Sequence, residues 1–129
     1  MKSKILIVED QADIRRLIRW SLEDSDSLIH EAANGTLALQ IAKVMKPDLM
    51  LLDVMMPGGI DGLEVCKEVK KDPELAHTIV IMLTAKASSK DHEMAREVGA
   101  DAFLPKPFSP ARLLELIEAL LKQRGRPAA

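Results

Sequence analysis

Residues 48–57 read Asp48-Leu-Met-Leu-Leu-Asp53-Val-Met-Met-Pro57, a continuous apolar run with an acid at its end. Such a run is typical of a strand that is buried on both faces of a sheet. Asp53 is therefore expected at the tip of a buried strand, where a lone charge is unfavourable. A carboxylate in that position usually has a charged partner, a bound metal or a shifted pKa.

Two further acids, Glu9 and Asp10, occupy the same kind of position, directly after the apolar run 5–8. Short apolar runs alternate with segments of helical periodicity along the chain, which indicates five strand-then-helix repeats. This alternation predicts an α/β fold, a doubly wound (βα)5 arrangement in which helices cover both faces of a five-stranded parallel sheet. The expected strands are residues 5–8, 27–31, 48–53, 78–83 and 102–104.

The carboxyl ends of the strands in an open parallel sheet share one rim, and ligands of such sheets bind there. Glu9, Asp10, Asp53, Thr84 and Lys106 all follow predicted strands, so we expect them at that rim. Carboxylates in one place repel one another, by about 4 kcal/mol for a pair ~4 Å apart at an effective dielectric constant near 20. One lysine offsets only part of the charge of three acids.

A divalent cation would balance the remaining negative charge. Because the rim offers oxygen ligands and no His or Cys, the hard ions Mg²⁺ and Mn²⁺ fit best. Two structural alternatives are equally good on this reasoning: a protonated acid, or an Asp–Lys ion pair without a metal. A carboxylate nucleophile, a metal, a lysine and a hydroxyl are also the groups that formation of an aspartyl phosphate needs.

The composition excludes several other classes of protein. The chain has 129 residues, enough for one domain, and a formal net charge of −2, without the basic balance that is typical of nucleic-acid binding. The single cysteine excludes an internal disulfide and fits a reducing compartment. With no apolar run of about 20 residues and no secretory signal, we expect a cytoplasmic protein without membrane insertion. Three basic groups are interpreted as solvated helix faces: Arg15, Arg16 and Arg19; Lys67, Lys70 and Lys71; and Lys122, Arg124 and Arg126.

Six short motifs follow one another along the chain: Ile-Leu-Ile-Val-Glu9-Asp10, Leu-Leu-Asp53-Val-Met-Met-Pro57, Asp61-Gly62-Leu-Glu, Leu83-Thr84-Ala85, Gly99-Ala-Asp-Ala-Phe103 and Lys106-Pro107-Phe108. In these motifs, from about residue 4 to residue 122, the chain resembles the receiver domain of bacterial two-component response regulators. The resemblance implies a flavodoxin-like strand order of 2-1-3-4-5. It also implies that residues 1–129 form a single receiver domain, with 123–129 as a tail or the start of a linker.

By this resemblance, Asp53 is the phosphoacceptor, which takes a phosphoryl group from a histidine of a partner kinase or phosphotransfer protein. Asp10 and Asp53 would ligate Mg²⁺ with the backbone carbonyl of Met55, while Glu9 acts through water. Lys106 would pair with the phosphoryl oxygens, and its bond to Pro107 is expected to be cis.

The resemblance also implies a conformational switch made by Thr84 and Phe103. The hydroxyl would move toward the phosphate and the ring would turn inward, although Phe103 lacks the hydroxyl of the tyrosine that is common there. The chain would thus be a signalling switch rather than a metabolic enzyme, catalysing its own phosphorylation and dephosphorylation. Its last two helices would contact a downstream partner or a second copy.

Two features of the sequence are specific to this chain. Between Pro57 and Asp61 this chain has Gly58-Gly59-Ile60, one residue more than is usual in receiver domains, which predicts a bulged loop. Met55 and Lys86 stand two residues beyond Asp53 and Thr84, where bulky side chains are expected to slow hydrolysis of the phosphate.

Three other functions fit the sequence less well. A metal-dependent phosphatase with an aspartate nucleophile would usually have an acid where Met55 stands. A flavin-binding electron carrier would have a Ser/Thr/Gly-rich loop where this chain has Glu9-Asp10-Gln11. A receiver that only docks partners is disfavoured by the complete set of acids, threonine and lysine.

Overall fold

The computed structural model describes residues 3–23, 25–56, 60–84 and 89–125, with the backbone alone described at 89–92 and 124–125. Five parallel strands form one sheet in the order β2-β1-β3-β4-β5. The predicted α/β class and strand order are therefore confirmed. The strands are β1 (Ser3–Val8), β2 (Ser27–Ala32), β3 (Leu49–Asp53), β4 (Ile79–Thr84) and β5 (Ala102–Pro105).

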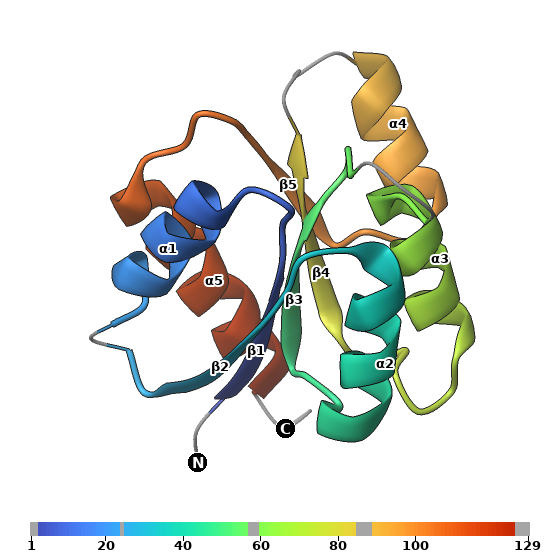
Figure 1. Ribbon diagram of the computed structural model, residues 1–129, viewed down its shortest axis with the longest axis horizontal. Coiled ribbons are helices and arrows are strands. Elements are labelled where there is room, and N and C mark those ends of the chain that lie inside the picture. The colour runs from blue at the N-terminus through green and yellow to red at the C-terminus, as the bar shows by residue number, and fades with distance from the viewer. Residues whose placement is uncertain (1–2, 24, 57–59, 85–88, 126–129) are drawn as a thin grey trace.

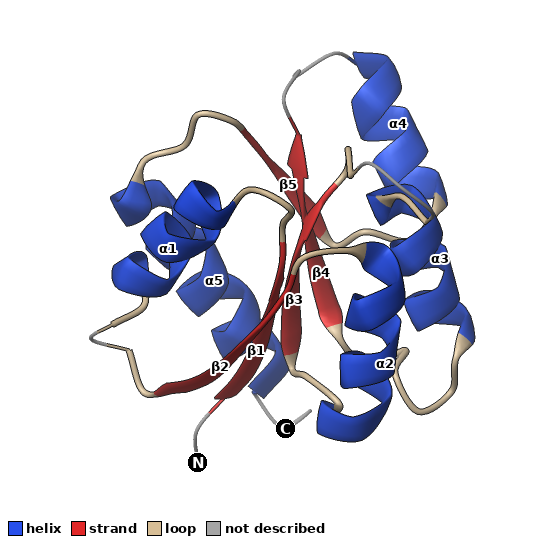
Figure 2. Cartoon of the chain, in the orientation of Figure 1, coloured by secondary structure: helices blue, strands red, loops and turns tan. Residues whose placement is uncertain are grey.

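Helices cover both faces of this sheet (Figures 1 and 2). Helices α1 and α5 lie side by side on one face, while α2, α3 and α4 cover the other. The helices are α1 (Ala12–Ser21), α2 (Gly35–Met45), α3 (Gly62–Lys71), α4 (Ser89–Glu97) and α5 (Pro110–Gly125). None of the helices within the described ranges combines the length and the apolar character of a membrane span.

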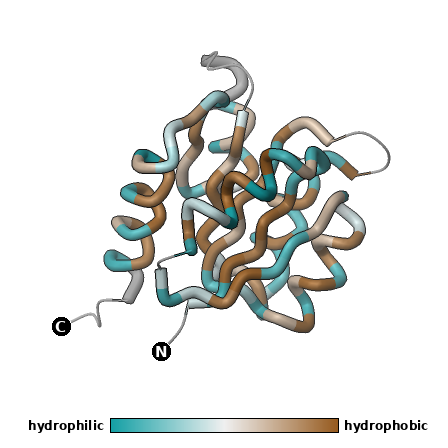
Figure 3. Tube along the Cα trace, turned by 60° about the vertical axis from the view of Figure 1, so that its left-hand side comes forward, coloured by the Kyte–Doolittle hydropathy of each residue, from teal (hydrophilic) through white to brown (hydrophobic). Residues whose placement is uncertain are grey.

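The strands contribute side chains to two separate hydrophobic cores, because successive side chains of a strand point to opposite faces of the sheet. In β3, Met50 and Leu52 pack under α2 and α3, whereas Leu49 and Leu51 pack under α1 and α5. All four are fully buried. Apolar residues accordingly run through the strands in Figure 3, while the helices alternate between apolar and polar stretches. Burial on both faces explains why β3 reads as a continuous apolar run.

The ends of several helices follow the local chemistry of the sequence. Asn34 and Asp61 cap α2 and α3, accepting hydrogen bonds from the backbone N–H groups three residues on. At α5 the Ser109 hydroxyl accepts a hydrogen bond from the N–H of Arg112 at 3.0 Å, with Pro110 in the first helical position, as predicted. Helix α5 then continues to Gly125, beyond the expected core boundary at residue 122.

Candidate functional site

Three carboxylates meet at the carboxyl ends of β1 and β3. Glu9, Asp10 and Asp53 each contribute one oxygen to a group in which these atoms all lie within 4.8 Å of one another. Glu9 and Asp53 are buried, whereas Asp10 is the most accessible of the three. The sheet register brings them together, because Val8 pairs with Leu52 and the chain turns away one residue later on each strand. This acidic cluster could bind a metal ion.

Lys106, which follows β5, supplies a positive charge to the cluster. Its Nζ lies 2.6 Å from Glu9 Oε1 and 3.4 Å from Asp53 Oδ1, with only 17% of the side chain exposed. Its backbone N–H donates to the carbonyl of Thr84 at 2.6 Å, and its peptide bond to Pro107 is cis, as expected. The lysine therefore bridges Glu9 and Asp53 and contacts Glu9 more closely.

Burial raises the pKa of both buried acids. For Glu9, desolvation outweighs the hydrogen bonds from Lys106 and from the backbone N–H of Gln11, and raises the pKa to about 7. For Asp53, desolvation likewise raises the pKa against the opposing charge of Lys106. The negative forms of these acids are thus only partly compensated by protein groups. The all-oxygen donor set and the excess of acid fit a hard divalent cation.

The other predicted site residues lie along the same rim or beside it. Thr84 is buried at the last position of β4, the strand that neighbours β3. Phe103 lies in β5, paired with Met82, and packs against the core under α2 and α3. The backbone N–H of Met55 donates to Asp53 Oδ1 at 3.2 Å, while its side chain is 73% exposed.

Helix α3 begins in direct contact with the backbone of the cluster. A Cβ atom at Gly62 would lie 2.0 Å from the carbonyl oxygen of Asp53, a distance that no side chain can occupy. The N–H of Gly62 donates to the carbonyl of Val54 at 3.0 Å. The glycine therefore permits α3 to begin against the end of β3, which fixes the backbone that carries Asp53.

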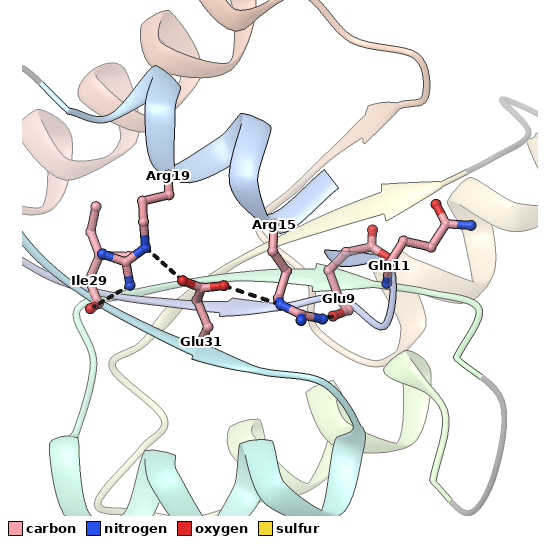
Figure 4. A network of polar contacts seen from close by, with 6 residues as sticks. All are labelled: Glu9, Gln11, Arg15, Arg19, Ile29 and Glu31. Carbon is pink, nitrogen blue, oxygen red and sulfur yellow. Dashed lines mark hydrogen bonds and ion pairs between the residues drawn. The ribbon is translucent and has the colours of Figure 1, made fainter. Parts of the chain in front are cut away.

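One polar network beside the cluster was not predicted from the sequence (Figure 4). Arg15 of α1 donates from its guanidinium to the carbonyl oxygen of Glu9 at 2.6 Å and to Glu31 Oε1 at 3.1 Å. Arg19, one turn later, donates to Glu31 Oε2 at 2.6 Å and to the carbonyl of Ile29 at 3.3 Å. The interpretation of these arginines as a solvated face is wrong for Arg15, whose side chain is only 20% exposed.

The prediction of a solvated helix face is also wrong for Lys70. Lys70 of α3 donates to Asp101 Oδ2 at 2.9 Å and to the carbonyl of Thr78 at 2.7 Å, and its side chain is 21% exposed. It joins the last turn of α3 to the residues that directly precede β4 and β5. The predicted bulge at Gly58-Gly59 and the expected effect of Lys86 lie outside the described residues.

Comparisons with known proteins agree with this geometry. Residues 5–118 match the family described as Response regulator receiver domain. The transcriptional regulatory protein ResD of Bacillus subtilis is 43% identical over 97% of this chain and 50% of its own length. The phosphate regulon transcriptional regulatory protein PhoB of Pseudomonas aeruginosa is 40% identical over 94% of this chain and 52% of its own. The chain thus spans about half the length of these curated relatives.

Solved structures show the same fold. The chemotaxis protein CheY4 of Vibrio cholerae superposes with a TM-score of 0.87 at 32% sequence identity, over 92% of this chain and 98% of that one. A CheY-like receiver domain protein from Methanospirillum hungatei gives a TM-score of 0.88 at 28% identity, over 96% and 97% of the two chains. On its fold, its motifs and these matches, the chain belongs to the response regulator receiver domain family.

Proposed function

We propose that Asp53 is the phosphoacceptor of this receiver domain and that Glu9, Asp10, Thr84 and Lys106 assist the transfer. The observation that carries the proposal is the buried contact of Lys106 with both Glu9 and Asp53 at the rim where the third acid, Asp10, also lies. A nucleophile is most useful where its charge is balanced and where donors already face the incoming oxygens. At this rim Lys106 supplies such a donor and part of the balancing charge.

In the proposed transfer, a carboxylate oxygen of Asp53 forms a bond to phosphorus as the bond from phosphorus to the donor's imidazole nitrogen breaks. Lys106 is placed to donate to the phosphoryl oxygens, because its Nζ already lies 3.4 Å from Asp53. The Thr84 hydroxyl can donate to the phosphoryl group after it arrives. The domain is thereby a switch that carries out its own phosphotransfer, without turnover of a metabolite.

Asp10 and Asp53, with the backbone carbonyl of Met55, would hold Mg²⁺ or Mn²⁺, and Glu9 would act on the ion through water. When bound, such an ion neutralises charge on the phosphoryl oxygens and on the acids themselves. The donor set supports this assignment, because carboxylate oxygens within 4.8 Å of one another match the preference of a hard cation.

Two further roles are proposed for residues near Asp53. Thr84 and Phe103 would form the switch pair that reports phosphorylation to the surface of α4, β5 and α5. Met55, exposed beside Asp53, would slow hydrolysis together with Lys86 by obstructing the approach of water. Faster loss of phosphate from the unaltered protein than from the Met55→Ala, Lys86→Ala double variant would contradict the second role.

The partners and the setting of the whole protein are also proposals. The phosphoryl donor would be a histidine kinase or a histidine phosphotransfer protein. The phosphorylated domain would then bind a downstream partner, or a second copy of itself, through α4 and α5. Family membership and the single, buried thiol of Cys66 support a cytoplasmic setting. We propose that residues 1–129 form one receiver domain with its core at 4–122.

Phosphorylation can be tested directly with a small phosphodonor and Mg²⁺, followed by intact mass. The wild type should gain the mass of one phosphoryl group, Asp53→Asn should not, and Asp13→Asn, an exposed acid on α1, should behave as the wild type. An unmodified wild type, or an undiminished adduct on Asp53→Asn, would overturn the proposal.

A further inference from the structure

The peptide group that joins Glu9 to Asp10 is held by a side chain from another element. The carbonyl oxygen of Glu9 belongs to that peptide and accepts a hydrogen bond from Arg15 Nη1 at 2.6 Å. A change in the ψ angle of Glu9 would move this carbonyl oxygen and would also change where the Asp10 carboxylate points relative to Glu9. A hydrogen bond at this atom opposes that change.

Glu9 is fixed by three further contacts. Its N–H donates to the carbonyl of Ala32 at 3.1 Å, which extends the pairing of β1 with β2 by one residue. Its carboxylate accepts from the backbone N–H of Gln11 at 3.2 Å and from Lys106 at 2.6 Å. Of these contacts, the one from Arg15 alone acts on the peptide that leads to Asp10.

Arg15 is itself held in place by Glu31 of β2. Both carboxylate oxygens of Glu31 are used, Oε1 by Arg15 at 3.1 Å and Oε2 by Arg19 at 2.6 Å (Figure 4). The planar guanidinium donates in two directions at once, to the acid of β2 and to the carbonyl after β1, and an ammonium would not reproduce that fixed fork. Glu31 offsets only part of the charge of Arg15, because Arg15 and Arg19 share this one carboxylate.

We infer that Arg15, aimed by Glu31, is a positioning residue for the metal site: it fixes the Glu9–Asp10 peptide so that both acids face Asp53. This inference rests on the proposed Mg²⁺ site. Groups that orient metal ligands without touching the metal typically change metal affinity by 10- to 100-fold when they are removed. Because Arg15 acts on the main chain between two acids, we expect an effect near tenfold, at the lower end of that range.

The sign of the effect separates positioning from simple electrostatics. Loss of a positive charge near a cation site should strengthen Mg²⁺ binding if charge alone matters. Positioning predicts the opposite, a weaker site in Arg15→Gln. Glu31→Gln should weaken binding on either account. Positioning alone predicts that the Arg15→Gln, Glu31→Gln double variant binds no more weakly than Arg15→Gln, because Glu31 acts through Arg15.

The experiment measures the Kd of Mg²⁺ by isothermal titration calorimetry on the unphosphorylated chain, with folding of each variant checked by circular dichroism. Arg16→Gln is the matched control, since Arg16 lies on the same helix with its side chain 79% exposed and only a 3.8 Å contact to Asp13. We expect a Kd about tenfold higher in Arg15→Gln and within about twofold of the wild type in Arg16→Gln. If Arg15→Gln does not fold, Arg15→Lys carries the test and should still bind more weakly than the wild type.

Equal or tighter Mg²⁺ binding in a folded Arg15 variant would overturn the inference and leave the proposed function standing. So would a double variant whose loss equals the product of the two single losses. Absence of Mg²⁺ binding in the wild type would instead remove the proposed metal site, and the inference with it. Phosphorylation by the small phosphodonor at saturating Mg²⁺ gives a second readout: a positioning role predicts that excess Mg²⁺ restores much of the rate.

Discussion

Replacement of Glu9 by glutamine should stabilise the metal-free protein at pH 8. Glu9 and Asp53 are both buried and face the single ammonium of Lys106, so one of the two negative charges has no full counterpart among these groups. Glutamine keeps one oxygen that can accept the hydrogen bond of Lys106 and removes one of those charges, but it loses the longer, 3.2 Å hydrogen bond from the backbone N–H of Gln11. The remaining pair, Asp53 with Lys106, is electrically balanced.

Two related figures bound the expected gain. The pKa of Glu9 rises from its ordinary 4.5 to about 7, and each tenfold change in proton affinity corresponds to about 1.4 kcal/mol, so the penalty is at most about 3.5 kcal/mol. Repulsion between two carboxylate charges that lie within 4.8 Å of one another is likewise at least about 3 kcal/mol at an effective dielectric constant near 20. Because Lys106 offsets part of the repulsion, we expect about 1–3 kcal/mol.

The pH dependence carries a definite sign. A carboxyl group whose pKa is higher in the folded state binds more protons when folded, so protons favour folding. The penalty from Glu9 is therefore absent below about pH 4.5, grows as the pH rises, and is complete above about pH 7. The advantage of Glu9→Gln should follow the same course, large at pH 8 and much smaller at pH 5.

Urea unfolding followed by circular dichroism, in EDTA at pH 5 and pH 8, measures this free energy of unfolding. Glu68→Gln, an exposed acid on α3, is the matched control and should change it little. Added Mg²⁺ should stabilise the wild type more than Glu9→Gln, since a ligand that binds only the folded state raises its stability. A variant no more stable than the wild type at pH 8, or equally favoured at both pH values, would refute the reasoning.

Urea unfolding of three further variants tests the contacts of Lys106 and the starts of helices α3 and α5. Lys106→Met should destabilise the metal-free protein at pH 8 by roughly 3 kcal/mol, the lower range for a broken buried pair, and a gain would contradict the charge argument. Gly62→Ala should destabilise by about 3 kcal/mol, because its Cβ would lie 2.0 Å from the Asp53 carbonyl oxygen; unchanged stability would show that α3 can move away freely. Ser109→Ala should lower the free energy of unfolding by about 1 kcal/mol, because the side-chain cap of α5 is lost. Ser109→Thr keeps a hydroxyl at this position and should keep most of that stability. Equal losses in the two variants would contradict a capping role.

The fold and the membership of the rim followed from the sequence because both depend on local patterns. A strand buried on both faces must be apolar throughout, as in residues 49–52, and the carboxyl ends of parallel strands must share one edge. Those two rules place Glu9, Asp53 and Lys106 together without any knowledge of side-chain geometry. The cis peptide at Lys106 depended instead on resemblance to the family.

The partners of individual side chains could not be predicted in the same way. Glu9 and Asp10 are adjacent acids after the same strand, and only the backbone turn decides that Glu9 is fully buried. Arg15 and Arg16 are likewise adjacent, yet the helix rotation directs one toward Glu31 and the other into solvent. The four-residue spacing of Arg15 and Arg19 was visible, but the acid that both contact lies on another strand, whose register no local pattern reveals.

The two separate cores have a consequence for how the domain tolerates change in its sequence. Leu51 and Leu52 are neighbours in the chain but pack in different layers, and the sheet lies between them. A smaller side chain at one of them leaves a cavity that only residues of its own layer can fill. Leu52 shares its layer with Val65, although the two lie far apart in the chain. Mutational effects in this domain should therefore couple by layer rather than by distance along the chain, so each half of the interior can evolve its packing independently.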